Sequence, residues 1–323
     1  MSAPNRISRK AGSIYRKNPF TGKVRKQLTH RSGFMEVKVA KSAGFCFGVR
    51  RAVQLVYDEA EKEEGHVYTM GPIIHNEQVV EDLEEKGVFS VDDDLICEKT
   101  GLKPPAGSVV IVRSHGISRD MSEMLDKSGY RIIDATCPFV DRIHKIVAEK
   151  SKEGYQIVII GNPAHPEVCG IRGWAGKECR TVESKEDAEN LALSFDRPVC
   201  IVSQTTFNYD KFQELVEIIK TLGYHVIVIN TICSATKERQ MEALELAGQS
   251  DAMIVIGGKK SSNTQKLYDI CRSQCENTYY IQTLDDLVTV NFQSDRCVGI
   301  TAGASTPNNI IQEVSTHVRG TKF

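Results

Sequence analysis

The segment YRIIDATCPFVDRIHKIV, residues 130–147, places a cysteine between two different hydrophobic patterns. The isoleucines at 132–133 are β-branched residues of the kind that favour a buried strand. From 140 to 147 apolar residues recur at helical spacing, and Pro138 suits the first position of a helix. Cys137 is therefore predicted to lie where the end of a strand meets the start of a helix.

The same arrangement occurs twice more in the chain. Cys46 lies between the strand and helix patterns of MEVKVAKSAGFCFGVRRAVQLV, and Cys233 between those of YHVIVINTICSATKERQMEAL. The three cysteines are 91 and 96 residues apart. A regular interval between similar segments predicts repeated structural units.

Two further kinds of loop have nearly the same interval. One kind is predicted to end strands at His75, His165 and Ser261, which are 90 and 96 residues apart. The other offers His115, Thr205 and Ser305, which are 90 and 100 residues apart. Nine strand-to-helix loops thus form three sets of three, and candidate polar and thiol side chains recur in them.

Strands that alternate with helices predict an α/β protein with parallel sheets. The intervals predict three similar α/β units of about 95 residues each. In open α/β sheets, ligands bind at the carboxyl ends of the strands, where these nine loops begin. If the units meet about a pseudo-threefold axis, the three cysteines converge.

The composition is that of a globular protein of two or three domains. Of 323 residues, 41% are hydrophobic and 26% charged, and no apolar run approaches the ~18 residues of a membrane span. Ten cysteines without a signal-peptide pattern argue against a disulfide framework and for a cytoplasmic location. Residues 1–34 hold nine Lys and Arg and no acidic residue, which predicts a disordered basic extension. The remaining residues hold 32 basic and 42 acidic side chains.

Cys46, Cys137 and Cys233 differ from the other cysteines because each precedes a helix, whose N-terminus stabilises a thiolate. Three converging thiolates suit a metal centre, and we favour an iron–sulfur cluster with one open iron over zinc. A lone thiol nucleophile would leave the threefold match unexplained. Buried packing is the interpretation for the seven others: Cys97, Cys169, Cys179, Cys200, Cys271, Cys275 and Cys297.

The polar side chains of the loops suggest a ligand site. The residues Ser261, Ser262 and Asn263 suit either an anion or an ordinary helix N-cap. Glu167 is a candidate proton donor if burial raises its pKa, or else a solvated acid in a turn. Four basic residues near these loops are interpreted as ordinary helix-start or surface charges: Lys237, Arg239, Lys259 and Lys260.

Nine short motifs, in order, resemble one family. They are GFCFGVRRAV, GPIIHN, RSHG, DATCPFV, HPEVCG, SQTT, TICSATKERQ, KKSSNT and TAGASTP. Together they are similar to the 4-hydroxy-3-methylbut-2-enyl diphosphate reductases, the IspH/LytB family. The resemblance covers about residues 35–317 and leaves out the basic extension.

The resemblance implies a trefoil of three similar α/β domains around one 4Fe–4S cluster per chain. The domains would be 47–137, 138–233, and 234–318 together with 35–45, so that the N-terminal strand joins the third domain. The cluster ligands implied are Cys46, Cys137 and Cys233. Residues matched to the diphosphate site are His75, His115, His165, Ser261, Ser262, Asn263 and Ser305. Glu167 matches the proton donor, and Thr205 the hydroxyl that positions the substrate alcohol and relays protons.

The activity implied is the last step of the non-mevalonate isoprenoid pathway. Two electrons and two protons would remove the allylic hydroxyl of the substrate, bound to the open iron, and give isopentenyl and dimethylallyl diphosphates. The resemblance implies ferredoxin or flavodoxin as electron donor. We expect no membrane or nucleic-acid partner and a monomer or homodimer. The alternatives are a three-cysteine redox sensor and a related reductive dehydratase with another allylic substrate.

Overall fold

The computed structural model describes residues 14–17, 24–27, 35–62, 66–92, 94–96, 101–287, 292 and 296–320. The chain divides into two compact units, Met1–Met35 and Glu36–Phe323. In the first unit, β1 (Ile14–Lys17) pairs antiparallel with β2 (Val24–Gln27). The predicted disorder of residues 1–34 stays a prediction. Apart from these two strands, that segment lies outside the described residues. The fold described next is that of the second unit.

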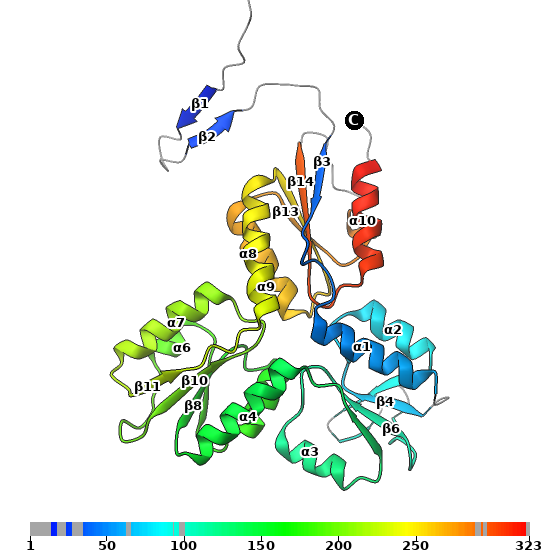
Figure 1. Ribbon diagram of the computed structural model, residues 1–323, viewed down its shortest axis with the longest axis vertical. Coiled ribbons are helices and arrows are strands. Elements are labelled where there is room, and N and C mark those ends of the chain that lie inside the picture. The colour runs from blue at the N-terminus through cyan, green and yellow to red at the C-terminus, as the bar shows by residue number, and fades with distance from the viewer. Residues whose placement is uncertain are drawn as a thin grey trace, which may run out of the picture. The chain divides into compact units, whose positions relative to one another are not determined.

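Three parallel four-stranded sheets form three lobes of the second unit (Figure 1). The first sheet has the order β5-β4-β6-β7. Its elements are α1 (Phe47–Ala60), β4 (Val67–Met70), α2 (Glu77–Glu85), β5 (Val88–Val91), β6 (Val109–Val112), α3 (Arg119–Asp126) and β7 (Arg131–Asp134). Helices α1 and α2 pack their apolar side chains on one face of the sheet, and α3 packs on the other.

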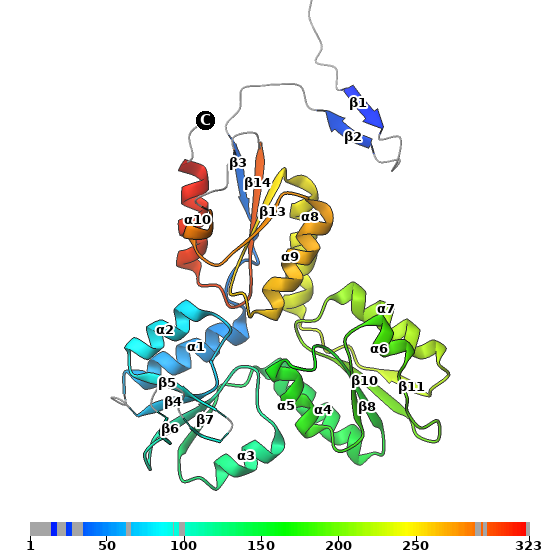
Figure 2. The ribbon, with the colours of Figure 1, turned by 180° about the vertical axis from the view of Figure 1, so that it is seen from behind.

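The second sheet has the order β11-β10-β8-β9. Its elements are α4 (Pro138–Lys152), β8 (Gln156–Ile160), α5 (Pro166–Trp174), β9 (Cys179–Val182), α6 (Lys185–Glu189), β10 (Val199–Ser203), α7 (Tyr209–Thr221) and β11 (Val226–Val228). Helices α4 and α5 cover one face and α6 and α7 the other. Figure 2, the view from behind, shows α5 beside α4.

The third sheet has the order β13-β12-β14-β3. Its elements are β3 (Glu36–Val39), α8 (Ser234–Gln249), β12 (Ala252–Ile256), α9 (Ser262–Gln274), β13 (Thr278–Ile281), the short 3₁₀ helix η1 (Leu284–Leu287), β14 (Cys297–Ala302) and α10 (Asn308–Gly320). Helices α8 and α9 share one face, and β3 pairs with β14 at the edge, as the family resemblance implied.

The central strands explain why the sheets are buried on both faces. Every residue of β8, β10 and β12 is buried, and their sequences are nearly continuous apolar runs. Such runs are typical of parallel strands covered by helices on both sides. The predicted α/β class with three parallel sheets is therefore confirmed. The predicted domain boundaries keep each sheet whole, and we retain them as a proposal.

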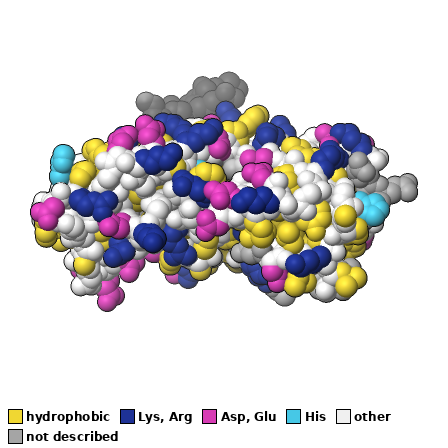
Figure 3. Space-filling model, turned by 90° about the horizontal axis from the view of Figure 1, so that it is seen from below, with side chains coloured by type: hydrophobic (Ala, Val, Ile, Leu, Met, Phe, Trp, Pro, Cys, Tyr) yellow, Lys and Arg dark blue, Asp and Glu magenta, His cyan; other side chains and the backbone are white. Residues whose placement is uncertain are grey.

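The three lobes place equivalent helices in equivalent positions. The pairs α1 and α2, α4 and α5, and α8 and α9 each cover one face of one sheet. No helix among the described residues is both long and apolar enough to cross a membrane. On the face seen in Figure 3, basic and acidic side chains lie interspersed with apolar ones.

Candidate active site

The three predicted cysteines occupy equivalent places in the fold. Cys46, Cys137 and Cys233 are the N-cap residues of α1, α4 and α8, and all three have extended backbones. These three helices begin near the centre of the trefoil (Figure 1). The strand-to-helix turn predicted at Cys137 is confirmed, since β7 ends at Asp134 and α4 begins at Pro138.

Equivalent backbone hydrogen bonds fix the three cysteines. The backbone N–H of Cys46 donates to the carbonyl of Ala304, that of Cys137 to Ser114, and that of Cys233 to Thr205, at 3.3, 3.0 and 3.1 Å. Each acceptor lies in a loop of the set that carries His115, Thr205 and Ser305: it is either that residue or its neighbour in the chain. The backbone therefore joins each thiol loop to a loop that carries polar side chains.

The thiols are close enough to influence one another. The pKa of Cys137 is raised to about 11, chiefly by burial and also by the neighbouring Cys46 and Cys233. A Cβ atom added at Gly48 of α1 would lie only 2.5 Å from the sulfur of Cys137. Among the described residues, the three sulfurs do not form a group with all ligand atoms within 4.8 Å.

The surroundings of the thiols fit a cluster with three protein ligands. The backbone N–H of Val49 donates to the sulfur of Cys46 at 3.5 Å. Backbone N–H groups of Phe139 likewise interact with Cys137, and those of Ala235 with Cys233. Hydrogen bonds to the sulfurs and the positive ends of helices are the usual means by which a protein stabilises such a centre.

Arg239 lies beside the thiols, which corrects its interpretation as a surface charge. Its side chain is 3% exposed and donates to the carbonyl oxygens of Ser42 and Gly44. It also interacts electrostatically with Cys46 and Cys233. Sequence patterns missed this role because Arg239 lies on the buried side of α8, although Ser234 and Lys237 of the first turn are exposed. The interpretation holds for Lys237, Lys259 and Lys260, which are exposed.

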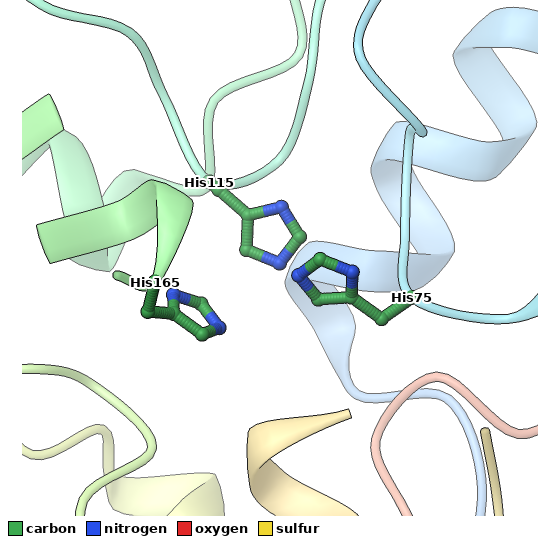
Figure 4. Close-up of side chains that lie close together, drawn as sticks. All are labelled: His75, His115 and His165. Carbon is green, nitrogen blue, oxygen red and sulfur yellow. The ribbon is translucent and has the colours of Figure 1, made fainter. Parts of the chain in front are cut away.

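The histidines from two lobes form one cluster. The ring centroids of His75 and His115 are 4.5 Å apart, and each lies 5.4 Å from that of His165 (Figure 4). Burial lowers the pKa of His75 and of His115, and takes that of His165 to about 3. All three imidazoles are therefore neutral at pH 7.

The electrostatics of the cluster favour an anion over a metal ion. One ring nitrogen from each histidine lies within 4.8 Å of the others, a spacing that alone would admit a metal. The positive charge of Arg113, however, lowers the pKa of all three rings, and Lys260 adds to it at His75 and Lys266 at His165, while Glu77 opposes it at His75. A positive surrounding repels a cation and attracts a phosphate.

Several buried polar atoms around the cluster lack partners within the described part of the chain. They are Nε2 of His75, Nδ1 of His115, and both side-chain polar atoms of Asn263. Buried groups without hydrogen bonds are costly, so these atoms point to a ligand. A single cavity is lined by these residues and by Val49, Ile74, Ser114, His165, Glu167, Thr206, Ser261, Ser262, Ala304 and Ser305.

The start of α9 supplies the third lobe's contribution. Ser261 is the N-cap and accepts a hydrogen bond from the backbone N–H of Thr264. Ser305 donates from its hydroxyl to the backbone carbonyl of His75 at 3.2 Å, which ties the third lobe to the first. The N-cap interpretation of Ser261 is confirmed, and the free N–H groups of the first helical turn still suit an anion.

Glu167 is buried and bonded to Thr205. Its carboxylate accepts from the backbone N–H of Thr205 at 2.6 Å and from the hydroxyl at 2.8 Å, and it is 2% exposed. Burial raises the pKa of Glu167 to about 7, against the opposing effect of these two hydrogen bonds. The alternative of a solvated acid is therefore wrong, and the side chain exchanges a proton near neutral pH.

Sequence patterns missed three residues of this site. All three lie within the quoted motifs, where they had no assigned role: Arg113 begins RSHG, Thr206 ends SQTT and lines the cavity, and Gly48 leaves room for the sulfur of Cys137. The signal was available for Gly48, since a glycine inside a helical pattern often marks a close approach.

The prediction that the other cysteines are buried is confirmed for some of them and wrong for one. Cys200, Cys271 and Cys275 are buried as expected, and Cys179 and Cys297 are half-buried. Cys169 is exposed, so its packing interpretation is wrong: it lies on the outer side of the short helix α5. Cys97 lies outside the described residues. All the described cysteines are free, in agreement with the absence of a disulfide framework.

Comparisons with known proteins agree with this geometry. The family model described as LytB protein matches residues 37–319. A 4-hydroxy-3-methylbut-2-enyl diphosphate reductase of Caldanaerobacter subterraneus is 46% identical over 289 residues, which cover 89% of this chain and 98% of the relative. One of Clostridioides difficile is 43% identical over 283 residues, covering 87% and 98%.

Two solved structures are also similar. The Plasmodium falciparum E-1-hydroxy-2-methyl-but-2-enyl-4-diphosphate reductase has a TM-score of 0.84 and 29% identity, covering 90% of each chain. A second, titled as (E)-4-hydroxy-3-methyl-but-2-enyl diphosphate reductase, the terminal enzyme of the non-mevalonate pathway, has a TM-score of 0.64 and 42% identity, covering 88% of this chain and 99% of that one. The sequence match, the fold and the arrangement of the site agree, and the chain belongs to the LytB family of oxidoreductases.

Proposed function

We propose that this enzyme converts (E)-4-hydroxy-3-methylbut-2-enyl diphosphate, two electrons and two protons into water and isopentenyl or dimethylallyl diphosphate. The observation that carries the proposal is the convergence, in one cavity, of an anion site and a buried acid beside three thiols. A redox sensor has no need for the anion site or the acid.

Cys46, Cys137 and Cys233 would hold one 4Fe–4S cluster. When bound, such a cluster supplies electrons and an iron with an open coordination position. Backbone N–H donors and the buried guanidinium of Arg239 lie beside the thiols. Both would offset the negative charge of the bound thiolates. The donor set supports this cofactor, because three equivalent cysteines leave one iron without a protein ligand.

The diphosphate would bind between the three lobes. The neutral rings of His75, His115 and His165 each offer one N–H donor. The first turn of α9 adds its N-terminal N–H groups and the side chains of Ser261, Ser262 and Asn263, and Ser305 adds its hydroxyl. Binding would satisfy the buried polar atoms that lack partners within the described part of the chain.

Glu167 would protonate the leaving hydroxyl, with Thr205 as the link. With a pKa of about 7, much of Glu167 is protonated at neutral pH, although it is buried. The hydroxyl of Thr205 already bonds to this carboxyl group, so it can pass a proton on while it positions the substrate alcohol. General acid catalysis of this kind contributes about 10²- to 10⁴-fold.

A ferredoxin or flavodoxin would supply the electrons, one at a time. The free cysteines of the described chain suit a reducing compartment, and we propose that the enzyme works in the cytoplasm as a monomer or homodimer.

The test is anaerobic turnover of this substrate with a reduced one-electron dye, by wild type and by Glu167→Gln. Wild type should be brown, contain about four irons per chain, and form both products. Glu167→Gln should keep its iron and its affinity for the diphosphate but turn over at least ~100-fold more slowly. The matched control Glu149→Gln, on α4, should behave as wild type.

A colourless wild type that binds only zinc would refute the cluster. Turnover near the wild-type rate by Glu167→Gln would remove Glu167 from the proton path.

A further inference from the structure

We propose that the groove between the first turns of α4 and α8 is the docking surface for a small acidic electron-transfer protein. The inference rests on the proposed function, which needs two electrons from outside the chain for each turnover. It names the place where they enter.

The groove is lined by residues that neighbour two of the three cysteines in the chain. Its volume is about 300 Å³, and it is lined by Phe139, Arg142, Tyr209, Asn230, Thr231, Ile232, Ser234 and Lys237. Ser234 directly follows Cys233, and Phe139 is the second residue after Cys137. A protein seated here would therefore contact residues that adjoin two of the three thiol positions in the chain.

The groove is separate from the proposed substrate cavity. The two have no lining residue in common. Residues near the starts of α2, α5 and α9 line the cavity. Residues near the starts of α4 and α8 line the groove. A donor can therefore dock while the substrate is bound, as two successive electron transfers to one substrate require.

The charge of the groove selects an acidic partner. Arg142 and Lys237 are the only charged residues that line it, and both are exposed. The ammonium of Lys237 lies 4.2 Å from the centre of the Tyr209 ring, which holds it at the rim. The N-termini of α4 and α8 add positive potential. The nearby Asp141 forms an ion pair with Lys145 at 2.6 Å.

Exposed aromatic side chains give the surface the composition of an interface. Phe139 is 36% exposed, and Phe47, which directly follows Cys46, is 68% exposed. A guanidinium nitrogen of Arg51 in α1 donates to the carbonyl of Thr136 at 3.1 Å, so α1 abuts the start of α4. Aromatic residues are enriched at protein interfaces. We call Phe47, Phe139, Arg142, Ser234 and Lys237 the electron-entry face.

The electron count fits transient docking. Each reduced donor loses one electron per encounter, so two encounters supply the two electrons that, with two protons, convert the allylic alcohol into product and water. Electron-transfer encounters are typically small interfaces whose association is steered by charge. A basic groove lined by the exposed Phe139 meets both conditions.

The experiment reverses the charge of the groove. The double variant Arg142→Glu/Lys237→Glu, with its cluster, is compared with Lys152→Glu/Lys177→Glu, whose residues are exposed and lie outside the groove. Lys152 is on the same helix as Arg142, about 15 Å further along. Affinity for an oxidised acidic 2Fe–2S ferredoxin is measured by calorimetry at low and high salt, with a flavodoxin as second probe.

We expect the groove variant to bind ferredoxin at least about tenfold more weakly at low salt, with a smaller salt dependence, and the control to bind as wild type. Turnover with the small reduced dye should be unchanged in both variants. Wild-type ferredoxin affinity in the groove variant would overturn the proposal. Failure of wild type to turn over with the dye would refute the proposed function instead, and the binding measurement would still test the face.

Discussion

Glu167 shows how burial turns an ordinary side chain into a candidate catalyst. The motif HPE is compatible with a solvated turn, and no pattern in the sequence decides between that and a buried acid. The structure decides, because Glu167 is buried and its carboxylate meets only Thr205 among the described hydrogen-bond donors. Burial without a neighbouring cation raises the pKa of a carboxyl group.

The raised pKa predicts the pH profile of turnover. Glu167 must carry its proton to donate it, so kcat with a reduced dye should fall as pH rises through about 7. Below that value the protonated form dominates, and this group should not limit the rate. The measurement is kcat from pH 6 to 9 under anaerobic conditions.

In Glu167→Gln, the residual rate should lack this fall, because the amide does not titrate. A wild-type profile that stays flat across pH 7, or the same fall in Glu167→Gln, would show that another group controls the rate.

Other residues show which features can be predicted from sequence patterns and which cannot. His75, Ser261 and Cys46 were predicted because polar side chains interrupt apolar patterns at repeated intervals. Arg239 was misjudged, since a basic residue near the start of a helix usually faces solvent. Its burial depends on carbonyl oxygens almost 200 residues away in sequence, those of Ser42 and Gly44. No local pattern reports such a contact.

The ends of the strands were predicted less well than their existence. The strands expected to reach His75, His165 and Ser261 end five residues earlier, at Met70, Ile160 and Ile256. In each case a glycine follows the last strand residue. Gly71 has a φ of +64°, and a Cβ at residue 161 would lie 2.9 Å from that of Gln204. Glycine frees the chain to leave the sheet, and the remaining loop carries the functional side chain to the cavity.

The packing of α1 against the start of α4 predicts the effect of a single methyl group. Gly48→Ala would place a Cβ 2.5 Å from the sulfur of Cys137, so the two helices would have to separate or the thiol to move. We expect the variant to fold with a lower melting temperature and to lose most of its iron. Iron content and thermal unfolding, each measured against wild type, are the readouts.

The matched control is Gly248→Ala in α8, where an added Cβ has no neighbour within 4 Å. It should keep its iron and gain up to about 1 kcal/mol in the free energy of unfolding, since alanine favours the helix. A full complement of iron in Gly48→Ala would show that the contact does not constrain the thiol.

The convergence of the three lobes is the feature that the sequence implied only indirectly. A repeat of 90 to 100 residues predicts three similar units, but it does not show that they meet. The hydrogen bonds that join the first and third lobes are long-range in sequence. Ser305 bonds to the carbonyl of His75, and the backbone of Cys46 bonds to that of Ala304. These bonds bring loops of the first and third lobes together, and the motifs alone do not report which residues pair.

The division of the chain predicts that residues 1–34 are dispensable for catalysis. The family match begins at residue 37, and the proposed site lies between Cys46 and Ser305. Deleting 1–34 should therefore leave iron content, melting temperature and dye-driven turnover unchanged. Deleting 1–40 is the matched control, because it removes β3, which pairs with β14 at the edge of the third sheet. That variant should be destabilised and lose iron, since the chain from β3 leads directly to Cys46. If deletion of 1–34 alone abolished turnover, the basic segment would belong to the working enzyme, and the Glu36–Phe323 unit would not suffice for the reaction.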